Sequence, residues 1–127
     1  MNQIAPVGTH CILELEGCPA ALLNDEPYIR EHIAEASRHG LSTLLNLTSH
    51  QFTPQGVTAL ALLAESHISI HTWPESGYAA LDVFTCGPRA RPKLACQYLI
   101  EALAASSHRL RVLPRGMRKE AACPVPA

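Results

Sequence analysis

The 127-residue sequence lacks any long apolar run. Its longest, residues 59–64, is far shorter than the ~20 residues that a membrane-spanning helix needs. No N-terminal stretch combines a basic flank, an apolar segment and a small-residue cleavage site, which is the pattern of a secretory signal. We therefore expect a soluble, cytoplasmic protein without a membrane partner. The length predicts one domain over residues 1–127.

Cysteine pairs at metal-binding or redox spacing are also absent, although the sequence has five cysteines. An odd number of cysteines without a secretory signal predicts free thiols rather than a disulfide framework. His67, His71 and Cys86 form a conceivable set of zinc ligands. However, two histidines four residues apart need a helix to act together, and this segment has the pattern of a strand. We expect no metal.

The net charge of −1 is small, but the two signs are unevenly distributed. Eight of the ten Lys and Arg residues lie between positions 89 and 119, with Glu101 as the only acid there. A basic stretch can bind nucleic acid, yet these residues are scattered and have few aromatic residues between them. A solvated helix face and tail is the simpler interpretation, so we expect no nucleic-acid partner.

β-forming residues are concentrated in the middle of the chain. Two strand-like runs, Ser66–Trp73 and Tyr78–Cys86, are joined by the sequence PESG at positions 74–77. The Pro and Gly of this link are typical of a turn, so the segment predicts a β-hairpin. If the hairpin centres on the turn, the numbers of paired residues sum to about 151.

This register brings chemically useful side chains to the open end of the hairpin. His71 faces Ala80, and Cys86 faces Glu65 or Ser66. A hydroxyl, a thiol and an imidazole could gather there as an active site. Strand alternation nevertheless points Ser66 and His71 to opposite faces, because the two positions differ by an odd number. A chain break at Ser66 would remove this conflict.

The remaining pattern predicts an α+β fold with a mainly antiparallel sheet and two helices on one face. Residues 57–63 are almost continuously apolar, so two helices cannot cover both faces of such a sheet. We expect the second face to pack on another subunit. The predicted elements are strands at 9–15, 41–48, 57–63 and 109–113, helices at 25–39 and 92–106, and a disordered tail from Pro114, most clearly over 116–127.

The hairpin and its flanks resemble one protein family, the short prokaryotic, pyruvoyl-dependent S-adenosylmethionine decarboxylases. The resemblance lies in Glu65-Ser66-His67, in IHTWPE at 70–75 and in the D-x-FTCG pattern at 82–87. It extends upstream through residues 8–10, 22–25 and 49–57, and covers roughly residues 8–115. The resemblance implies a homodimer of two-layer protomers in a four-layer αββα arrangement, with active sites between the facing sheets.

The resemblance also implies that the chain makes its own cofactor. The Ser66 oxygen attacks the Glu65 carbonyl, the resulting ester eliminates, and a pyruvoyl group replaces Ser66. The products are a β chain (1–65) and an α chain (66–127). The pyruvoyl ketone forms a Schiff base with the substrate amine and accepts electrons as PLP does, so neither PLP nor a metal is needed.

The resemblance implies roles for five further side chains. His71 is the proton acceptor for self-processing, and Cys86 is the proton donor that returns a proton after CO₂ leaves. Glu75 contacts the ribose hydroxyls, and Phe52 stacks on adenine or packs in the core. Thr58 stands where the family more often has Ser and keeps the hydroxyl, so it retains a hydrogen-bonding role among the substrate-binding residues. His67 is read only as a structural histidine.

Three other functions are compatible with parts of the sequence. One is a hydrolase with a catalytic triad of Ser66, His71 and Asp82. However, the sequence has no Gly-x-Ser-x-Gly elbow, and the register puts Asp82 nearer Ser69 than His71. A dimeric binding module that has lost processing is a second possibility. The third is a pyruvoyl decarboxylase of the same fold that acts on ornithine or arginine, for which the processing residues would be identical.

Overall fold

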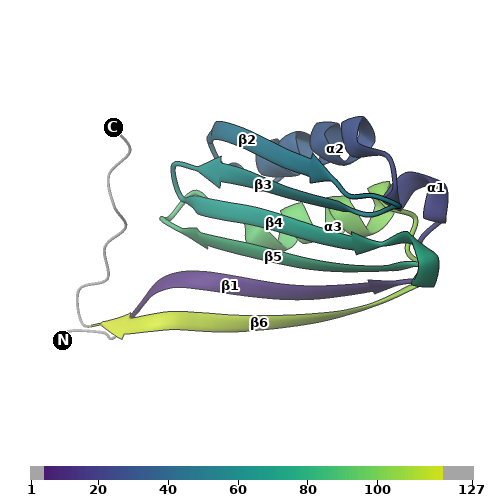
Figure 1. The fold of residues 1–127 in the computed structure, drawn as a ribbon. Helices are drawn as coiled ribbons and strands as arrows, with labels where there is room; N and C mark the ends of the chain where they lie inside the picture. Colours follow the sequence, from purple (N-terminus) through teal and green to yellow (C-terminus); the bar gives the residue numbers. More distant parts are fainter. Residues whose placement is uncertain (1–4, 119–127) are drawn as a thin grey trace.

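The computed structural model describes residues 5–118, which form two layers. One layer is a six-stranded sheet with the order β2-β3-β4-β5-β1-β6, and every neighbouring pair is antiparallel. Figure 1 shows α2 and α3 on the same side of this sheet. The elements are β1 (Ala5–Glu16), α1 (Ala20–Leu23), α2 (Glu26–His39), β2 (Leu44–Gln51), β3 (Val57–Leu63), β4 (Ser66–Trp73), the 3₁₀ turn η1 (Pro74–Ser76), β5 (Tyr78–Cys86), α3 (Pro92–Ala102) and β6 (Ser107–Arg118).

The predicted hairpin is the centre of the sheet. Its strands β4 and β5 have the expected bounds, and His71 pairs with Ala80 as the register predicts. Gly77 closes η1 with φ +65°, a left-handed conformation that glycine adopts without steric cost. A Cβ at this position would also lie 3.2 Å from the Cys18 carbonyl oxygen. Turn chemistry and strand pattern therefore agree on one register.

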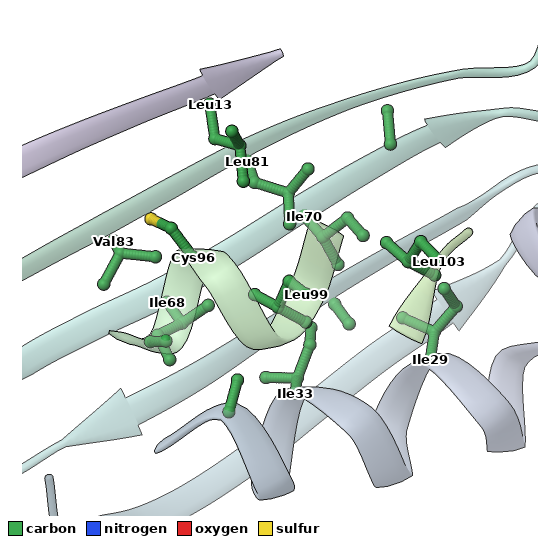
Figure 2. Close-up of a cluster of buried hydrophobic side chains, with 14 of the residues drawn as sticks. Leu13, Ile29, Ile33, Ile68, Ile70, Leu81, Val83, Cys96, Leu99 and Leu103 are labelled. Carbon is green, nitrogen blue, oxygen red and sulfur yellow. The ribbon is translucent and has the colours of Figure 1, made fainter. Parts of the chain in front are cut away.

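The core lies between the sheet and the helices, and strand alternation decides which side chains enter it. In β3 the buried residues Val57, Ala59, Ala61 and Leu63 alternate with less buried ones. From the helix layer, α2 and α3 contribute side chains that meet those of β4 and β5 (Figure 2). The contributors labelled there are Ile29 and Ile33 of α2, Cys96 and Leu99 of α3, and Leu103, which directly follows α3.

The opposite face of the sheet has no helix over it within residues 5–118. Leu60 and Leu62 point to this side and are 40% and 50% exposed. His71 and Trp73 of β4 are exposed on the same side, since Ile70 and Thr72 between them are buried. We call this surface the open face. The sequence prediction of an α+β fold with its helices on one face is thus confirmed.

Helix α2 begins and ends at the predicted positions for local reasons. The Asp25 side chain accepts a hydrogen bond from the Tyr28 N–H, and Pro27 occupies the first turn, where its missing N–H is not needed. Gly40 follows the last helical residue and donates to the Ala36 carbonyl oxygen. None of the described helices is long and apolar enough to cross a membrane.

Several predicted boundaries are wrong where the chain turns. Helix α3 ends at Ala102 rather than at 106, because Ala104 takes φ +51° and the Ser106 N–H then pairs with the Glu16 carbonyl oxygen. Strand β2 runs over 44–51 rather than 41–48, since Leu41 has φ +56° and its N–H donates to the Arg38 carbonyl oxygen near the end of α2. The short helix α1 was not predicted.

Strand β6 corrects the prediction of a disordered tail from Pro114. It continues to Arg118 and pairs with β1 along its length, with Thr9 opposite Pro114 and Ala5 opposite Arg118. Pro114 is tolerated because β6 is an edge strand, where a missing N–H breaks no ladder on the outer side. Because β1 pairs with this longer β6, it begins at Ala5 rather than at 9. The rest of the predicted tail, 119–127, lies outside the described residues.

Candidate functional site

Ser66 begins β4 in a strained backbone conformation. Its φ of +143° is outside the range that a non-glycine residue normally adopts, and such residues persist only where their surroundings hold them. Ser66 lines a pocket of about 260 Å³ with Phe84 and Cys86 among its walls. The Ser66 Oγ lies 3.4 Å from the Nδ1 of the neighbouring His67. Ser66 therefore borders a cavity, and its hydroxyl lies beside an imidazole.

The carbonyl that precedes Ser66 is held from the other strand. The Cys86 N–H donates to the Glu65 carbonyl oxygen at 3.0 Å, and the Cys86 Sγ lies 3.3 Å from the same oxygen. An N–H in this position polarises the carbonyl and stabilises negative charge that develops on its oxygen. The predicted meeting of Cys86 with Glu65 and Ser66 is confirmed.

A second polar cluster lies at the other end of β4. The His71 Nδ1 and the Thr58 Oγ1 are 3.0 Å apart, across the pairing of β4 with β3. They line a pocket of about 340 Å³ together with Phe52, Trp73 and Glu75. The three predicted substrate residues and the predicted proton acceptor therefore share one pocket. Trp73 was not singled out from the sequence, although it sits inside the IHTWPE segment.

The two clusters do not meet within one protomer. Ser66 and His71 lie five positions apart in an extended strand, which at ~3.3 Å per residue places them about 16 Å apart. The predicted gathering of hydroxyl, thiol and imidazole at the open end of the hairpin is therefore correct for Ser66 and Cys86 and wrong for His71. The hairpin register itself imposes this separation, because His71 pairs with Ala80 and Ser66 with Thr85.

His67 is the histidine that contacts Ser66, and the sequence reading missed it. Its ring lies 6.2 Å from that of Phe84, on the open face. Burial lowers the pKa of His67; Asp82 opposes and His10 reinforces this shift. The imidazole is therefore neutral at pH 7 and can accept a hydrogen bond. Direct adjacency to Ser66 was the only signal in the sequence.

Asp82 contacts His10 rather than His71, which argues against a hydrolase triad. Its Oδ1 lies 2.9 Å from the His10 Nε2, and in the ladder it is opposite Ser69, as predicted. Arg115 donates to the His10 Nδ1 at 3.1 Å, so the Nε2 carries the proton given to Asp82. Among residues 5–118, no three His, Cys, Asp or Glu side chains are grouped to hold a metal ion.

Among the cysteines of residues 5–118, one differs from the prediction. Cys11, Cys18 and Cys96 are free and buried. Cys86, by contrast, carries a disulfide bond, so the prediction of free thiols is wrong there. Any role of Cys86 as a proton donor concerns its reduced form.

The lowered pKa of His67 predicts a pH-dependent stability. Between the folded-state pKa and about 6.5, the unfolded chain binds a proton that the folded chain resists, so stability falls as the pH drops through this window. In a Ser66→Ala background, which removes the hydroxyl, His67→Gln should flatten the fall in Tm between about pH 7 and 5. His108→Gln, at an exposed position on β6, is the control. If Tm fell equally with pH in the variant and in its background, the lowered pKa of His67 would be contradicted.

Comparison with known proteins places this geometry in a family. The model of the S-adenosylmethionine decarboxylase family matches residues 9–116. The S-adenosylmethionine decarboxylase proenzyme of Prochlorococcus marinus (strain MIT 9313) is 58% identical over 109 residues, which are 86% of this chain and 87% of that protein. The proenzyme of the same name from Synechococcus sp. (strain WH7803) is 60% identical over 105 residues, 83% of this chain and 82% of that protein.

A solved structure agrees with the sequence relatives. The crystal structure of the adenosylmethionine decarboxylase from Aquifex aeolicus VF5 superimposes with a TM-score of 0.86 at 37% identity, covering 91% of this chain and 96% of that one. Fold, motif order and sequence identity point to one assignment. This chain belongs to the S-adenosylmethionine decarboxylase family.

Proposed function

We propose that the chain is a pyruvoyl-dependent decarboxylase of S-adenosyl-L-methionine that forms its cofactor by cleaving the bond between Glu65 and Ser66. Family membership supports the reaction, and the relatives' name, proenzyme, supports a processing step. One observation supports the position of the cleavage site. The Glu65 carbonyl accepts the Cys86 N–H at 3.0 Å directly beside a strained serine whose φ is +143°. The bond to be broken thus has a polarised carbonyl and lies next to a residue with a strained backbone.

Self-cleavage begins when the Ser66 Oγ attacks the Glu65 carbonyl carbon. The peptide nitrogen leaves, and the chain continues through an ester, which relieves the strain at Ser66. Removal of the Ser66 α-proton then expels the Glu65 carboxylate and leaves dehydroalanine. Tautomerisation and hydrolysis with loss of ammonia give a pyruvoyl group on residue 66. The chain ends as a β chain, 1–65, and an α chain, 66–127.

The processed site would combine the pyruvoyl group with side chains that bind and protonate. When formed, the pyruvoyl group would supply an electrophilic ketone for the substrate amine and an acceptor for the electrons released with CO₂. Cys86, as a reduced thiol beside residue 66, would return a proton to the substrate α-carbon. Assays of this role require a reductant, because only the thiol carries the proton.

A homodimer explains how His71 takes part. Because His71 lies about 16 Å from Ser66 in its own chain, a second copy must supply it. Two open faces packed against each other in opposite directions would lay the His71 end of one β4 over the Ser66 end of the other. The exposed Leu60 and Leu62 support this packing, since it would bury them. The four-layer arrangement follows, with helices outside and both sites between the sheets.

The His71 pocket has the groups needed to recognise a nucleoside. Phe52 is 47% exposed and packs against the His50 ring in an edge-to-face arrangement at 4.6 Å between ring centroids, and its exposed part could stack on adenine. Glu75 lies in η1, at the rim of the same pocket, and can accept from two adjacent ribose hydroxyls. The Thr58 hydroxyl orients the His71 ring through its 3.0 Å contact. The product would be decarboxylated S-adenosylmethionine, an aminopropyl donor of the kind used in spermidine synthesis.

The cleavage is tested by intact mass. The wild-type chain should resolve into two fragments that meet at Glu65 and Ser66, with the second fragment blocked to N-terminal sequencing. Ser66→Ala should remain one chain, because it has no nucleophile. Ser69→Ala, three residues further along the same strand, should be cleaved like the wild type. A wild-type chain that stays intact after prolonged incubation would rule out the pyruvoyl cofactor.

The shared site predicts complementation between two inactive variants. His71→Ala and Ser66→Ala chains should each remain uncleaved alone. When both are expressed together with different tags, the His71→Ala chain should be cleaved, because its Ser66 meets His71 of the other copy. A Ser66→Ala, His71→Ala double variant should give no rescue. Absence of rescue in purified heterodimers would place processing within one chain.

The pocket predicts the substrate through Glu75. Loss of its charge-assisted hydrogen bonds, worth ~1.5–3 kcal/mol, should lower kcat/KM for S-adenosylmethionine about ten- to a hundredfold in Glu75→Ala, while self-cleavage proceeds. CO₂ release is measured from S-adenosylmethionine, ornithine and arginine in parallel. Faster release from either amino acid, insensitive to Glu75→Ala, would favour the ornithine or arginine decarboxylase instead.

A further inference from the structure

The side chain of Glu65 is bound by a residue that no comparison draws attention to. Its carboxylate accepts the Thr43 N–H at 2.8 Å through Oε1, and the Thr43 hydroxyl lies 3.4 Å from Oε2. The Ala64 N–H donates to the Thr43 carbonyl oxygen at 2.9 Å. Three polar contacts therefore join the turn between β3 and β4 to one residue 22 positions earlier. We call them the Thr43 clamp.

The clamp is anchored to the helix layer rather than to the hairpin. Thr43 directly precedes β2, in the connection that leaves α2. The Ser42 N–H donates to the Ser37 carbonyl oxygen at 2.8 Å, and the Leu41 N–H donates to that of Arg38 at 2.9 Å. This connection is thus tied to the last turn of α2. It provides a fixed point outside the strands that carry the cleavage site.

Glu65 is consequently held from two sides. Thr43 holds its side chain, and the Cys86 N–H holds its carbonyl oxygen at 3.0 Å. Between these two anchors the residue has little freedom to rotate about its backbone. A strained conformation such as φ +143° at Ser66 survives only when its neighbours are fixed in this way. If the side-chain anchor were lost, the turn could rotate and relax that strain.

We propose that Glu65 is a positioning residue for self-cleavage: through the Thr43 clamp, its side chain fixes its own carbonyl against the Cys86 N–H and keeps Ser66 strained. This inference rests on the proposed function, since it concerns the same cleavage. It assigns a task to the Glu65 side chain, whereas the reaction itself consumes only the main-chain carbonyl. The requirement is for an acceptor of the right length, not for a negative charge.

The length requirement predicts different cleavage rates for three substitutions of Glu65. Glu65→Ala removes the acceptor, and Glu65→Asp keeps the charge but is one methylene too short to reach Thr43. Both should slow self-cleavage about tenfold or more, because the Thr43 N–H then has no acceptor on residue 65 and the turn is free to relax. Glu65→Gln keeps the length, with an amide oxygen for the Thr43 N–H and an NH₂ group for the Thr43 hydroxyl. It should cleave within about threefold of the wild type.

A variant at the other end of the clamp provides a second test. Thr43→Val keeps the backbone N–H and removes only the longer hydroxyl contact, so it should slow cleavage by no more than about threefold. Glu31→Ala, at an exposed position on α2, is the control for loss of a carboxylate. Rates are followed by intact mass from freshly purified, uncleaved chains, and Tm is measured for each variant in a Ser66→Ala background.

Rescue by Gln but not by Asp, with Tm values close to that of the background, is the expected pattern. A merely structural role would lower Tm in step with the rate and would not separate Gln from Asp. Cleavage of Glu65→Ala or Glu65→Asp at the wild-type rate would overturn the proposal, and so would equal slowing of Gln and Ala. If the wild-type chain itself does not cleave, the proposed function fails instead, which is a distinct result.

Discussion

The last rung of the β4–β5 ladder is the interaction on which the candidate site depends. There the Cys86 N–H meets the Glu65 carbonyl oxygen at 3.0 Å, just beyond the pairing of Ser66 with Thr85. Because side chains alternate along a strand, a slip of one residue would reverse every orientation in the hairpin. The turn at η1 and the buried Ile68 and Ile70 prevent such a slip, since both would be displaced by it. The register that builds the core is therefore also the one that presents the proposed cleavage site.

The same alternation divides the sheet into a structural face and a chemical face. Apolar residues that pack under α2 and α3 fill one side. The other side carries His67 and His71, together with exposed leucines that no described helix covers. Polar groups at strand positions remain accessible there, where a second helix layer would have desolvated them at a cost. A sheet with one uncovered face can thus hold titratable groups rigidly and still leave them available for chemistry.

The basic residues near the C-terminus have a role in the fold that differs from the helix face and tail first considered. Arg109, Arg111 and Arg115 lie on β6, the outermost strand, and Arg115 also reaches His10. Charged side chains on an edge strand discourage pairing with another sheet. The Arg109–Glu16 pair, at 4.0 Å and exposed, contributes little to stability by itself.

By itself, the sequence determined those features that depend on residues close together along the chain. The hairpin register, the Asp25 cap of α2 and the alternation in β3 follow from turn chemistry and periodicity, and the family follows from unbroken motifs. Only the tertiary structure decided the end of α3, the extension of β6 and the contact of Thr43 with Glu65. In each of these, the partner is remote in the chain, so no local pattern encodes it. The distance between Ser66 and His71 belongs to the same class, because it becomes evident only when a regular strand holds both residues in extended geometry.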